Sequence, residues 1–279
     1  MRESEFQPEY GLIGAGAVND SLVARLPRKV QALGPVAAVS FRVASRIVNS
    51  LGAGVPARSA DELNALRFIL FHSSPDQFPA LTEALASAKI RWRGKSLVFC
   101  DCECPDETRE LFEGRGADVA VLRRSQLPSR LILEGTGPAL AFAHRLARDL
   151  GVKALEIAAE NKQAFEMALT LGSGALSPLI DQTATLLRQC GVRDAEASRL
   201  AAALFEQTAR EYARTGRQSW VWYQRAPDDA RIVAQLNAVG EQLRRIAAEL
   251  ILFGLEEAGR HGESAVTIRG ALERRDAAH

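Results

Sequence analysis

The sequence predicts an α/β domain with a mostly parallel sheet, followed by an all-α domain. As far as residue 157, short apolar runs alternate with amphipathic stretches, which indicates strands joined by helical crossovers. From residue 158 the strand signals stop and long helical patterns take over. We therefore expect a cofactor-binding domain at residues 1–157. A helical domain at residues 158–279 is expected to supply a substrate wall and a dimer interface.

A Gly-x-Gly turn near the amino terminus indicates which kind of α/β domain this is. The apolar run 10–13 enters Gly14-Ala15-Gly16-Ala17-Val18-Asn19, and an amphipathic stretch, 22–33, leaves it. Strand, phosphate-binding turn and helix in this order predict a Rossmann dinucleotide-binding domain. We expect the first glycine to permit a sharp turn and the second to let the backbone approach a pyrophosphate. The helix after the turn is expected to offer free N–H groups to the phosphates.

Asn19 stands where this fingerprint usually has Gly or Ala, a position that governs close packing of helix and strand. Its amide either hydrogen-bonds a phosphate or a neighbouring loop, or marks a loosened site. The sequence leaves both alternatives open.

The residues that end the second predicted strand, 36–41, indicate which dinucleotide binds. Enzymes that prefer NAD usually have Asp or Glu here to bind the ribose 2′-hydroxyl. This chain has Ser40, Arg42 and Arg46, and no acidic residue between this strand and Asp61. A hydroxyl and two guanidinium groups suit the 2′-phosphate of NADP(H). The alternative is that both arginines lie on a solvated helix face.

Further strands and helices complete the first predicted domain. Strands are expected at 67–72, 95–100, 118–123, 130–134 and 153–157, helices at 44–51, 78–88, 107–114 and 137–150, and a short helix or a turn at 60–66. Right-handed crossovers place the ends of parallel strands at one edge, where ligands bind. His72, Ser73 and Ser74 fall at that edge and are predicted to contact the cofactor. His72 is either a proton donor beside the nicotinamide or a hydrogen-bonded residue of the strand end.

The second half of the chain predicts four helices, at 160–171, 176–190, 194–215 and 227–259. Their apolar faces exceed what one subunit covers, so we expect a homodimer through the helical domain. A polar and aromatic stretch, 216–226, holds Trp220, Trp222 and Tyr223. These rings line a substrate site, form a dimer contact or pack in the core.

Composition and charge exclude several partners. The formal net charge of +1 gives no global reason to expect nucleic acid. No apolar run approaches the roughly 20 residues that span a bilayer. Residues 1–10 are polar, unlike a signal peptide. We therefore expect a cytoplasmic protein that binds a small-molecule substrate and neither nucleic acid nor membrane.

Three of the four cysteines form the run Cys100-x-Cys102-x-Cys104. Alternate residues of an extended strand share a face, so this spacing would allow the three thiols to bind one metal ion. Zinc sites, however, normally use cysteine pairs two to four residues apart that are matched by a second pair. We therefore predict reduced thiols and no metal site.

Several stretches occur in a familiar order between about residues 9 and 215. They are Leu12-Ile13-Gly14-Ala15-Gly16, Val39-Ser40-Phe41-Arg42, Ser74-Pro75-Asp76, Leu133-Glu134-Gly135, Ala159-Glu160-Asn161-Lys162-Gln163-Ala164-Phe165-Glu166 and Leu171-Gly172-Ser173-Gly174. This series resembles the Rossmann-like oxidoreductases of the domain-of-unknown-function 2520 type (DUF2520). These are relatives of pyrroline-5-carboxylate reductase, ketopantoate reductase and the F420-dependent NADP oxidoreductases, within the 6-phosphogluconate-dehydrogenase-like group. The resemblance implies NADP and hydride transfer to or from a small carbonyl or imine.

The chain also departs from the family that it resembles. A basic or imidazole residue is usual at the position of Glu166, and Asn is frequent at that of Gly174. Where the family usually has a His-x-Ser-Gly stretch, this chain has Phe99–Cys104. The position of a His-Pro pair that is usual in the family falls around Leu122-Arg123 in this chain. The cofactor half of the pattern is retained and the substrate half is altered. That combination fits a changed substrate, or a catalytically inactive NADP-binding sensor or interaction protein.

Candidate catalytic residues lie where the helical domain begins. Reduction of a carbonyl or imine needs the nicotinamide held beside the substrate and a proton for the developing alkoxide or amine. Lys162 is the candidate donor or electrostatic stabiliser, and Ser173 is expected to face the same cleft, on the same helix or after a break at Gly172. The alternative is a surface lysine and a turn serine. Glu166 is expected to form a helical ion pair with Lys162, with a catalytic carboxylate as the alternative.

Overall fold

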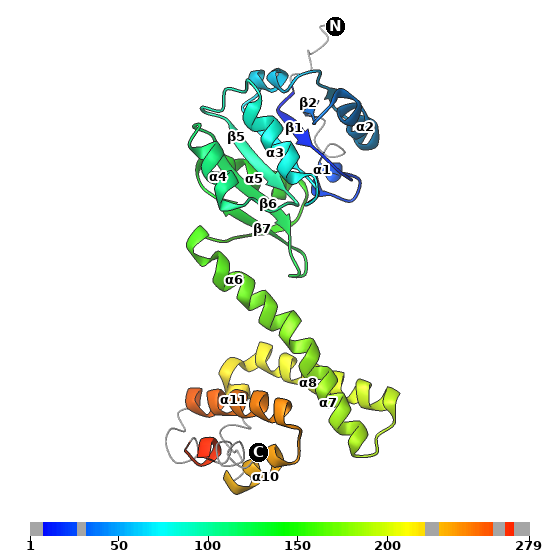
Figure 1. Cartoon of the computed structure of the whole chain (residues 1–279), viewed down its shortest axis with the longest axis vertical. Helices are drawn as coiled ribbons and strands as arrows, with labels where there is room; N and C mark the ends of the chain where they lie inside the picture. Colours follow the sequence, from blue (N-terminus) through cyan, green and yellow to red (C-terminus); the bar gives the residue numbers. More distant parts are fainter. Residues whose placement is uncertain (1–7, 27–31, 221–228, 259–265, 271–279) are drawn as a thin grey trace. The chain divides into compact units, whose positions relative to one another are not determined.

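The computed structural model describes residues 8–26, 32–220, 229–258 and 266–270. The chain divides into two compact units, Met1–Leu169 and Thr170–His279, and each is described by itself. The first unit contains an eight-stranded sheet in the order β3-β2-β1-β4-β5-β6-β7-β8 (Figure 1). The expected split of roles between residues 1–157 and 158–279 stays a prediction.

The sheet is parallel except for one pair of strands. The strands are β1 (Tyr10–Gly14), β2 (Leu33–Ala37), β3 (Val55–Pro56), β4 (Phe68–His72), β5 (Ser96–Cys100), β6 (Asp118–Arg124), β7 (Arg130–Gly135) and β8 (Lys153–Glu156). β7 runs antiparallel to β6, and β8 pairs with β7 in parallel. β1 and β4 lie side by side at the centre, so the chain order reverses there, as in a Rossmann sheet. The predicted mostly parallel sheet is confirmed, and the short β3 is an addition to it.

Helices cover both faces of this sheet (Figure 1). The helices of the first unit are α1 (Leu22–Arg25), α2 (Phe41–Leu51), the 3₁₀ helix η1 (Ala60–Ala65), α3 (Phe78–Ser87), α4 (Asp106–Glu113), α5 (Gly137–Asp149), the 3₁₀ helix η2 (Ala159–Asn161) and α6 (Lys162–Leu169), and the last two contribute no side chain to either core. Successive strand residues point to opposite faces. On one face Leu70 and Val98 pack in a core with α5, and on the other Phe71 and Phe99 pack with α3 and α4. Burial on both faces explains why the central strands are continuously apolar.

The segment between the Gly turn and α2 differs from the prediction. The helix expected at 22–33 ends at Arg25, and the strand expected at 36–41 is β2, which spans Leu33–Ala37. Gly34 and Pro35 therefore lie in a strand and do not terminate a helix. Parallel pairing of β2 with β1 sets this register. Ser40 follows the strand as the N-cap of α2, where its hydroxyl accepts a 3.4 Å hydrogen bond from the backbone N–H of Val43.

The second unit is helical, as expected, with one difference in detail. It contains the π-helical segment η3 (Thr170–Ala175), α7 (Leu176–Gln189), α8 (Asp194–Thr215), the 3₁₀ helix η4 (Gly216–Ser219), α10 (Asp229–Asn237) and α11 (Glu241–Glu257). Of the two alternatives at Gly172, the break is not observed, because Gly172 lies within the π-helical segment. The single helix expected at 227–259 is wrong, because Gly240 is the N-cap of a new helix. Trp222 and Tyr223 lie outside the described residues.

A small apolar core holds α10 and α11 together, with Ile232, Leu236 and Leu252 among its buried side chains. Trp220, at the end of η4, lies under the guanidinium of Arg217, 5.5 Å from the ring centroid. Within the described ranges, we find no helix with the length and apolar character that a membrane span requires.

Candidate functional site

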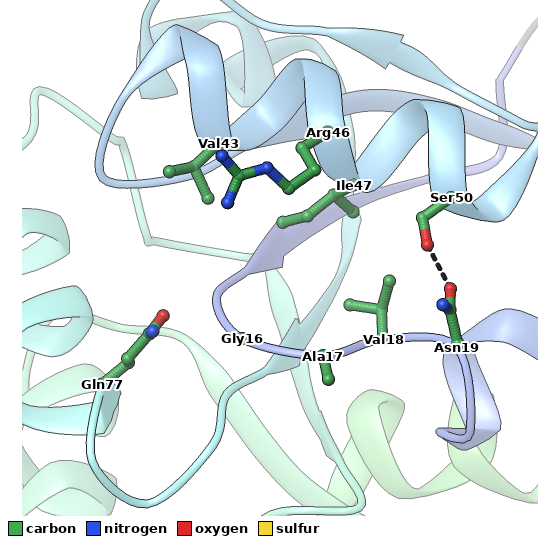
Figure 2. A pocket seen from close by; sticks show the side chains of 9 residues that line it. All are labelled: Gly16, Ala17, Val18, Asn19, Val43, Arg46, Ile47, Ser50 and Gln77. Atoms are coloured by element: carbon green, nitrogen blue, oxygen red, sulfur yellow. Dashed lines mark hydrogen bonds between the residues drawn. The ribbon is translucent and has the colours of Figure 1, made fainter.

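The Gly turn after β1 borders a cavity of about 260 Å³ at the carboxyl ends of the parallel strands (Figure 2). Three segments line it: residues 16–19 of the turn, the α2 residues Val43, Arg46, Ile47 and Ser50, and Gln77 just before α3. The turn and α2 thus supply opposite walls, and we call this space the turn cavity. Its place beside the central strand pair is where α/β sheets bind ligands.

The two glycines of the turn differ in their backbone conformation and in what surrounds them. Gly16 has φ +83°, and a Cβ there would lie 2.6 Å from Oγ of Ser74, so only glycine fits. Gly14 has no such backbone requirement, but a Cβ there would lie 3.0 Å from Cδ1 of Ile47. The expected role of Gly14 in a sharp turn stays a prediction, and the close approach of α2 is a second reason for a small residue there. Ser74 packs against the turn at Gly16, and Ser73 donates a 2.9 Å hydrogen bond to the carbonyl of Ser74.

His72 ties the turn to two neighbouring strands. Its backbone carbonyl accepts a 2.9 Å hydrogen bond from the N–H of Ala15. Its buried ring places Nδ1 2.8 Å from the carbonyl oxygen of Cys100 and Nε2 3.3 Å from that of Ala17. Both partners are acceptors, so a neutral ring donates to one of them and only an imidazolium donates to both. The ring of His72 therefore connects Ala17 of the turn to Cys100 at the end of β5.

The helix after the turn does not present a free amino terminus. α1 has only four residues, and the N–H of Leu22 donates a 2.7 Å hydrogen bond to Oδ2 of Asp101. The expectation that this helix offers free N–H groups to phosphates is therefore wrong for its first residue. Asp101 is buried and also accepts hydrogen bonds from the backbone N–H of Arg124 at 3.1 Å and from its Nε at 3.2 Å.

Asn19 bonds a neighbouring element. Its Oδ1 accepts a hydrogen bond from the hydroxyl of Ser50, which joins the turn to α2 across the turn cavity (Figure 2). Val18, by contrast, is buried in the core. The two arginines predicted to bind a 2′-phosphate are both exposed; Arg46 lines the cavity and Arg42 does not.

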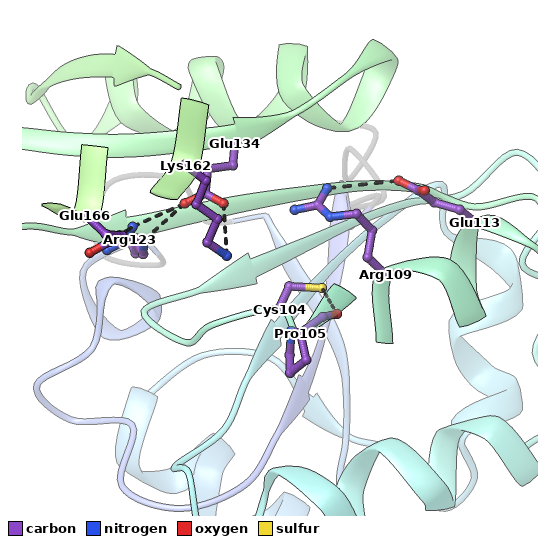
Figure 3. A network of polar contacts seen from close by, with 8 residues as sticks. All are labelled: Cys104, Pro105, Arg109, Glu113, Arg123, Glu134, Lys162 and Glu166. Carbon is purple, nitrogen blue, oxygen red and sulfur yellow. Dashed lines mark hydrogen bonds and ion pairs between the residues drawn. The ribbon is translucent and has the colours of Figure 1, made fainter. Parts of the chain in front are cut away.

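A second polar cluster surrounds the buried carboxylate of Glu134, whose side chain is 4% exposed (Figure 3). The Arg123 guanidinium contacts Oε1 of Glu134 at 3.2 and 3.4 Å, and Nζ of Lys162 lies 3.5 Å from Oε2. Arg123 also bonds the carboxylate of Glu166 on α6. Burial disfavours the charged Arg123, but hydrogen bonds and charges from Glu166 and Glu134 outweigh it and raise its pKa. We call these four residues the Glu134 cluster.

The Glu134 cluster pairs its charges differently from the prediction. Lys162 was expected to pair with Glu166, but it pairs with Glu134 while Glu166 pairs with Arg123. Sequence reasoning did not select Arg123 or Glu134 as site residues. One sequence feature could have identified them: Arg123 directly follows the apolar run 119–122, and Glu134 directly follows the apolar run 131–133. Ser173 lies in the second unit, so its expected role beside Lys162 stays a prediction.

The three cysteines of the run 100–104 are protonated thiols at neutral pH. Burial raises the pKa of Cys102 to about 12, with smaller contributions from its neighbours. Burial also raises the pKa of Cys104 to about 12, against the opposing charges of Arg109 and Lys162. Thiols of this kind are poor nucleophiles. The described part of the chain holds no group of three or more His, Cys, Asp or Glu side chains placed to bind a metal ion.

Comparisons with known proteins agree with this architecture. No curated protein matches the sequence. The structure is similar to that of BF3122 from Bacteroides fragilis, described as a candidate NADP oxidoreductase, with 15% identity, a TM-score of 0.68, and coverage of 90% of this chain and 98% of that one. It is also similar to an imine reductase from Aspergillus terreus in complex with NADPH4 and dibenz[c,e]azepine, with 18% identity, a TM-score of 0.57, and coverage of 96% and 93%.

A third similar structure is a reductive aminase from Aspergillus terreus in complex with NADPH4, cyclohexanone and allyl amine. It has 18% identity, a TM-score of 0.54, and coverage of 96% of this chain and 93% of that one. At these identities the likeness establishes the fold. The chain therefore has the fold of the Rossmann-type oxidoreductases, and its residues 129–221 match the family described as Domain of unknown function (DUF2520).

Proposed function

We propose that this protein is an NADP(H)-dependent oxidoreductase that transfers a hydride to or from a small carbonyl or imine compound. The observation that carries the proposal is the turn cavity, where a glycine turn faces Arg46 across the carboxyl end of β1. Two of the similar structures, an imine reductase and a reductive aminase, are complexes with a form of NADPH, which supports the choice of cofactor.

In this proposal the residues of the turn cavity hold the phosphates of NADP(H). The backbone of residues 14–19 borders the pyrophosphate, and Gly16 permits its close approach. Arg46 pairs with the 2′-phosphate, and Ser40 and Arg42 stay candidates at the adjacent start of α2. His72, Ser73 and Ser74 do not line the turn cavity and stay candidate cofactor contacts at the carboxyl end of β4. Because Asp101 occupies the first N–H of α1, phosphate binding depends more on the turn and on α2 than in the usual fingerprint.

Lys162 is proposed as the residue that supplies a proton, or a positive charge, to the substrate. Its side chain is 27% exposed, and its ammonium group lies 3.5 Å from the carboxylate of Glu134, whose side chain is almost fully buried. The negative charge of Glu134 attracts the Lys162 side chain and fixes its direction. The bound cofactor supplies or accepts the hydride. Ser173 is retained as a second candidate contact to the substrate.

The first test is cofactor selectivity, measured by isothermal titration calorimetry. We expect NADPH to bind at least about tenfold more tightly than NADH, because a charge-assisted hydrogen bond contributes roughly 1.5–3 kcal/mol. Arg46→Gln is expected to remove most of that difference and to leave NADH affinity within about twofold. Arg42→Gln tests the second arginine, and Arg91→Gln, an exposed arginine in the loop before β5, is the control.

The same titration separates the proposal from its rival, a binding protein without turnover. If neither dinucleotide binds with a dissociation constant below about 1 mM, the turn cavity is not a dinucleotide site, and both the oxidoreductase and the binding-protein hypotheses are wrong. If NADPH binds, a screen of keto acids, aldehydes, imines and F420 follows, with NADPH absorbance as the signal. If NADPH binds tightly and none of these compounds oxidises it, the result favours the sensor or interaction protein. The observation that supports this rival is the altered substrate half of the family pattern.

We also propose a homodimer through the helical unit. Large apolar side chains on α8 and α11 are exposed in the single chain: Leu200, Leu204, Ile246, Leu250 and Phe253. Covering such a surface is a common reason for association. Light scattering is expected to give twice the 30.3 kDa mass of the chain, and Leu204→Glu with Phe253→Glu to lower it toward 30.3 kDa. A 30.3 kDa species at all concentrations up to ~100 μM, well above usual dimer dissociation constants, contradicts the proposal.

A further inference from the structure

A second cavity in the first unit, of about 710 Å³, is lined by basic side chains and belongs to none of the sites above. Its lining comes from the end of α1, the turn between β6 and β7, and the start of β8. The basic residues in this lining are Arg25, Arg124, Arg130 and Lys153, and we call the space the basic cavity. It shares no lining residue with the turn cavity.

The sheet topology forces these charges together. The tight connection from β6 to antiparallel β7 places Arg124 beside Leu131. β8 then pairs with β7 so that Lys153 is the direct partner of Arg130. Like charges on directly paired strand residues destabilise a sheet. The repulsion between Arg130 and Lys153 cannot be seen in the sequence, because α5 separates the two residues along the chain.

The lining provides little internal compensation for this charge. Neither Asp nor Glu occurs among the described residues that line the basic cavity. Among the four basic residues, Arg124 alone contacts an acidic side chain in the described part of the chain: Asp101 lies 3.1 and 3.2 Å from its guanidinium and so fixes its orientation. Arg25, Arg130 and Lys153 are exposed to solvent at the cavity wall. A multiply charged anion would relieve the repulsion that the fold itself imposes.

We propose that the basic cavity binds a small molecule that carries phosphate groups. Its volume lies in the range of small-molecule sites, about 300–1,000 Å³. Guanidinium groups recognise phosphate through paired hydrogen bonds, and lysine binds it as a point charge. More than one negative charge is needed to balance three uncompensated cations. A nucleic acid is disfavoured because the chain as a whole has a net charge of only +1. The inference is independent of the proposed oxidoreductase activity.

The test is calorimetric titration of the full chain with inorganic pyrophosphate at low ionic strength. Pyrophosphate is expected to bind, and Arg130→Gln with Lys153→Gln to weaken this binding at least tenfold. Pyrophosphate that enters the turn cavity occupies a separate site, so Arg46→Gln is expected to affect that site alone and to leave the affinity of the basic cavity within about twofold. Lys89→Gln with Arg91→Gln removes the same charge from an exposed loop before β5 and is the matched control.

Several results would overturn the proposal. Absence of pyrophosphate binding, or loss of binding only in Arg46→Gln, shows that the basic cavity does not take phosphate. Equal weakening in the matched control shows a general effect of charge. A single-stranded oligonucleotide that displaces pyrophosphate at lower concentration points to nucleic acid instead. Thermal unfolding confirms that the double variant folds, and Lys153→Gln alone, expected to weaken binding about threefold or more, provides a milder second variant.

Discussion

Replacing Lys162 with methionine is expected to lower kcat about 100-fold or more, the usual range for loss of a general acid. Methionine keeps much of the length and apolar stem of lysine but cannot donate a proton or carry a charge. The NADPH dissociation constant is expected to change less than about twofold, because Lys162 does not line the turn cavity. Steady-state turnover of the substrate found in the screen, and calorimetry with NADPH, measure the two effects separately.

Two further variants make this result specific to the position of the charge. Lys162→Arg keeps the cation near Glu134 and is expected to recover part of kcat. Lys89→Met removes an exposed lysine at another edge of the first unit and is expected to leave turnover unchanged. If Lys162→Met turns over within about threefold of the parent protein, a range too small for loss of a general acid, Lys162 is a surface lysine and the proposed role is wrong.

Replacing Glu134 with glutamine is expected to destabilise the first unit by about 2–3 kcal/mol. The substitution preserves shape but removes the charge that Arg123 and Lys162 share in a buried position. Arg123 retains Glu166 as a partner, which keeps the loss below that of a fully orphaned buried ion. Chemical denaturation of the full chain, followed by a signal from the sheet, measures the change.

Glu113→Gln is the matched control for this prediction. Its carboxylate also pairs with an arginine, Arg109, but at 4.0 Å and with a 43% exposed side chain. Exposed pairs contribute little, so a change below about 0.5 kcal/mol is expected. Combining Glu134→Gln with Arg123→Met is expected to recover part of the loss, because both ends of the pair are then neutral. Equal stability of Glu134→Gln and Glu113→Gln contradicts the prediction.

Local patterns were sufficient where a single element carries its own signal. Apolar runs at 10–13, 67–72 and 95–100 became central strands because a strand buried on both faces must be apolar throughout. Helix α8 begins and ends at the residues predicted, 194 and 215. The predictions failed where a partner decides the outcome, as at Leu33, which joins β2 because β1 pairs with it.

The candidate sites show the same division. Gly16 and Arg46 could be selected from spacing alone, because a glycine turn and a nearby guanidinium are local features of one crossover. The Glu134 cluster could not, since its members come from three segments and one carboxylate accepts two cations. Helical spacing predicted that Lys162 pairs with Glu166. In the structure each of them pairs with a more deeply buried residue of the sheet, Lys162 with Glu134 and Glu166 with Arg123.

The sequence by itself determined the order of strands and helices, the glycine turn and the arginines that follow β2, because each depends on residues close together in the chain. Only the tertiary structure decided that Asp101 caps α1, that Glu134 holds Lys162, and that Arg130 and Lys153 lie on paired strands. These contacts depend on strand register and on burial. Both are properties of the assembled sheet, so residues distant in sequence acquire their partners only when it forms.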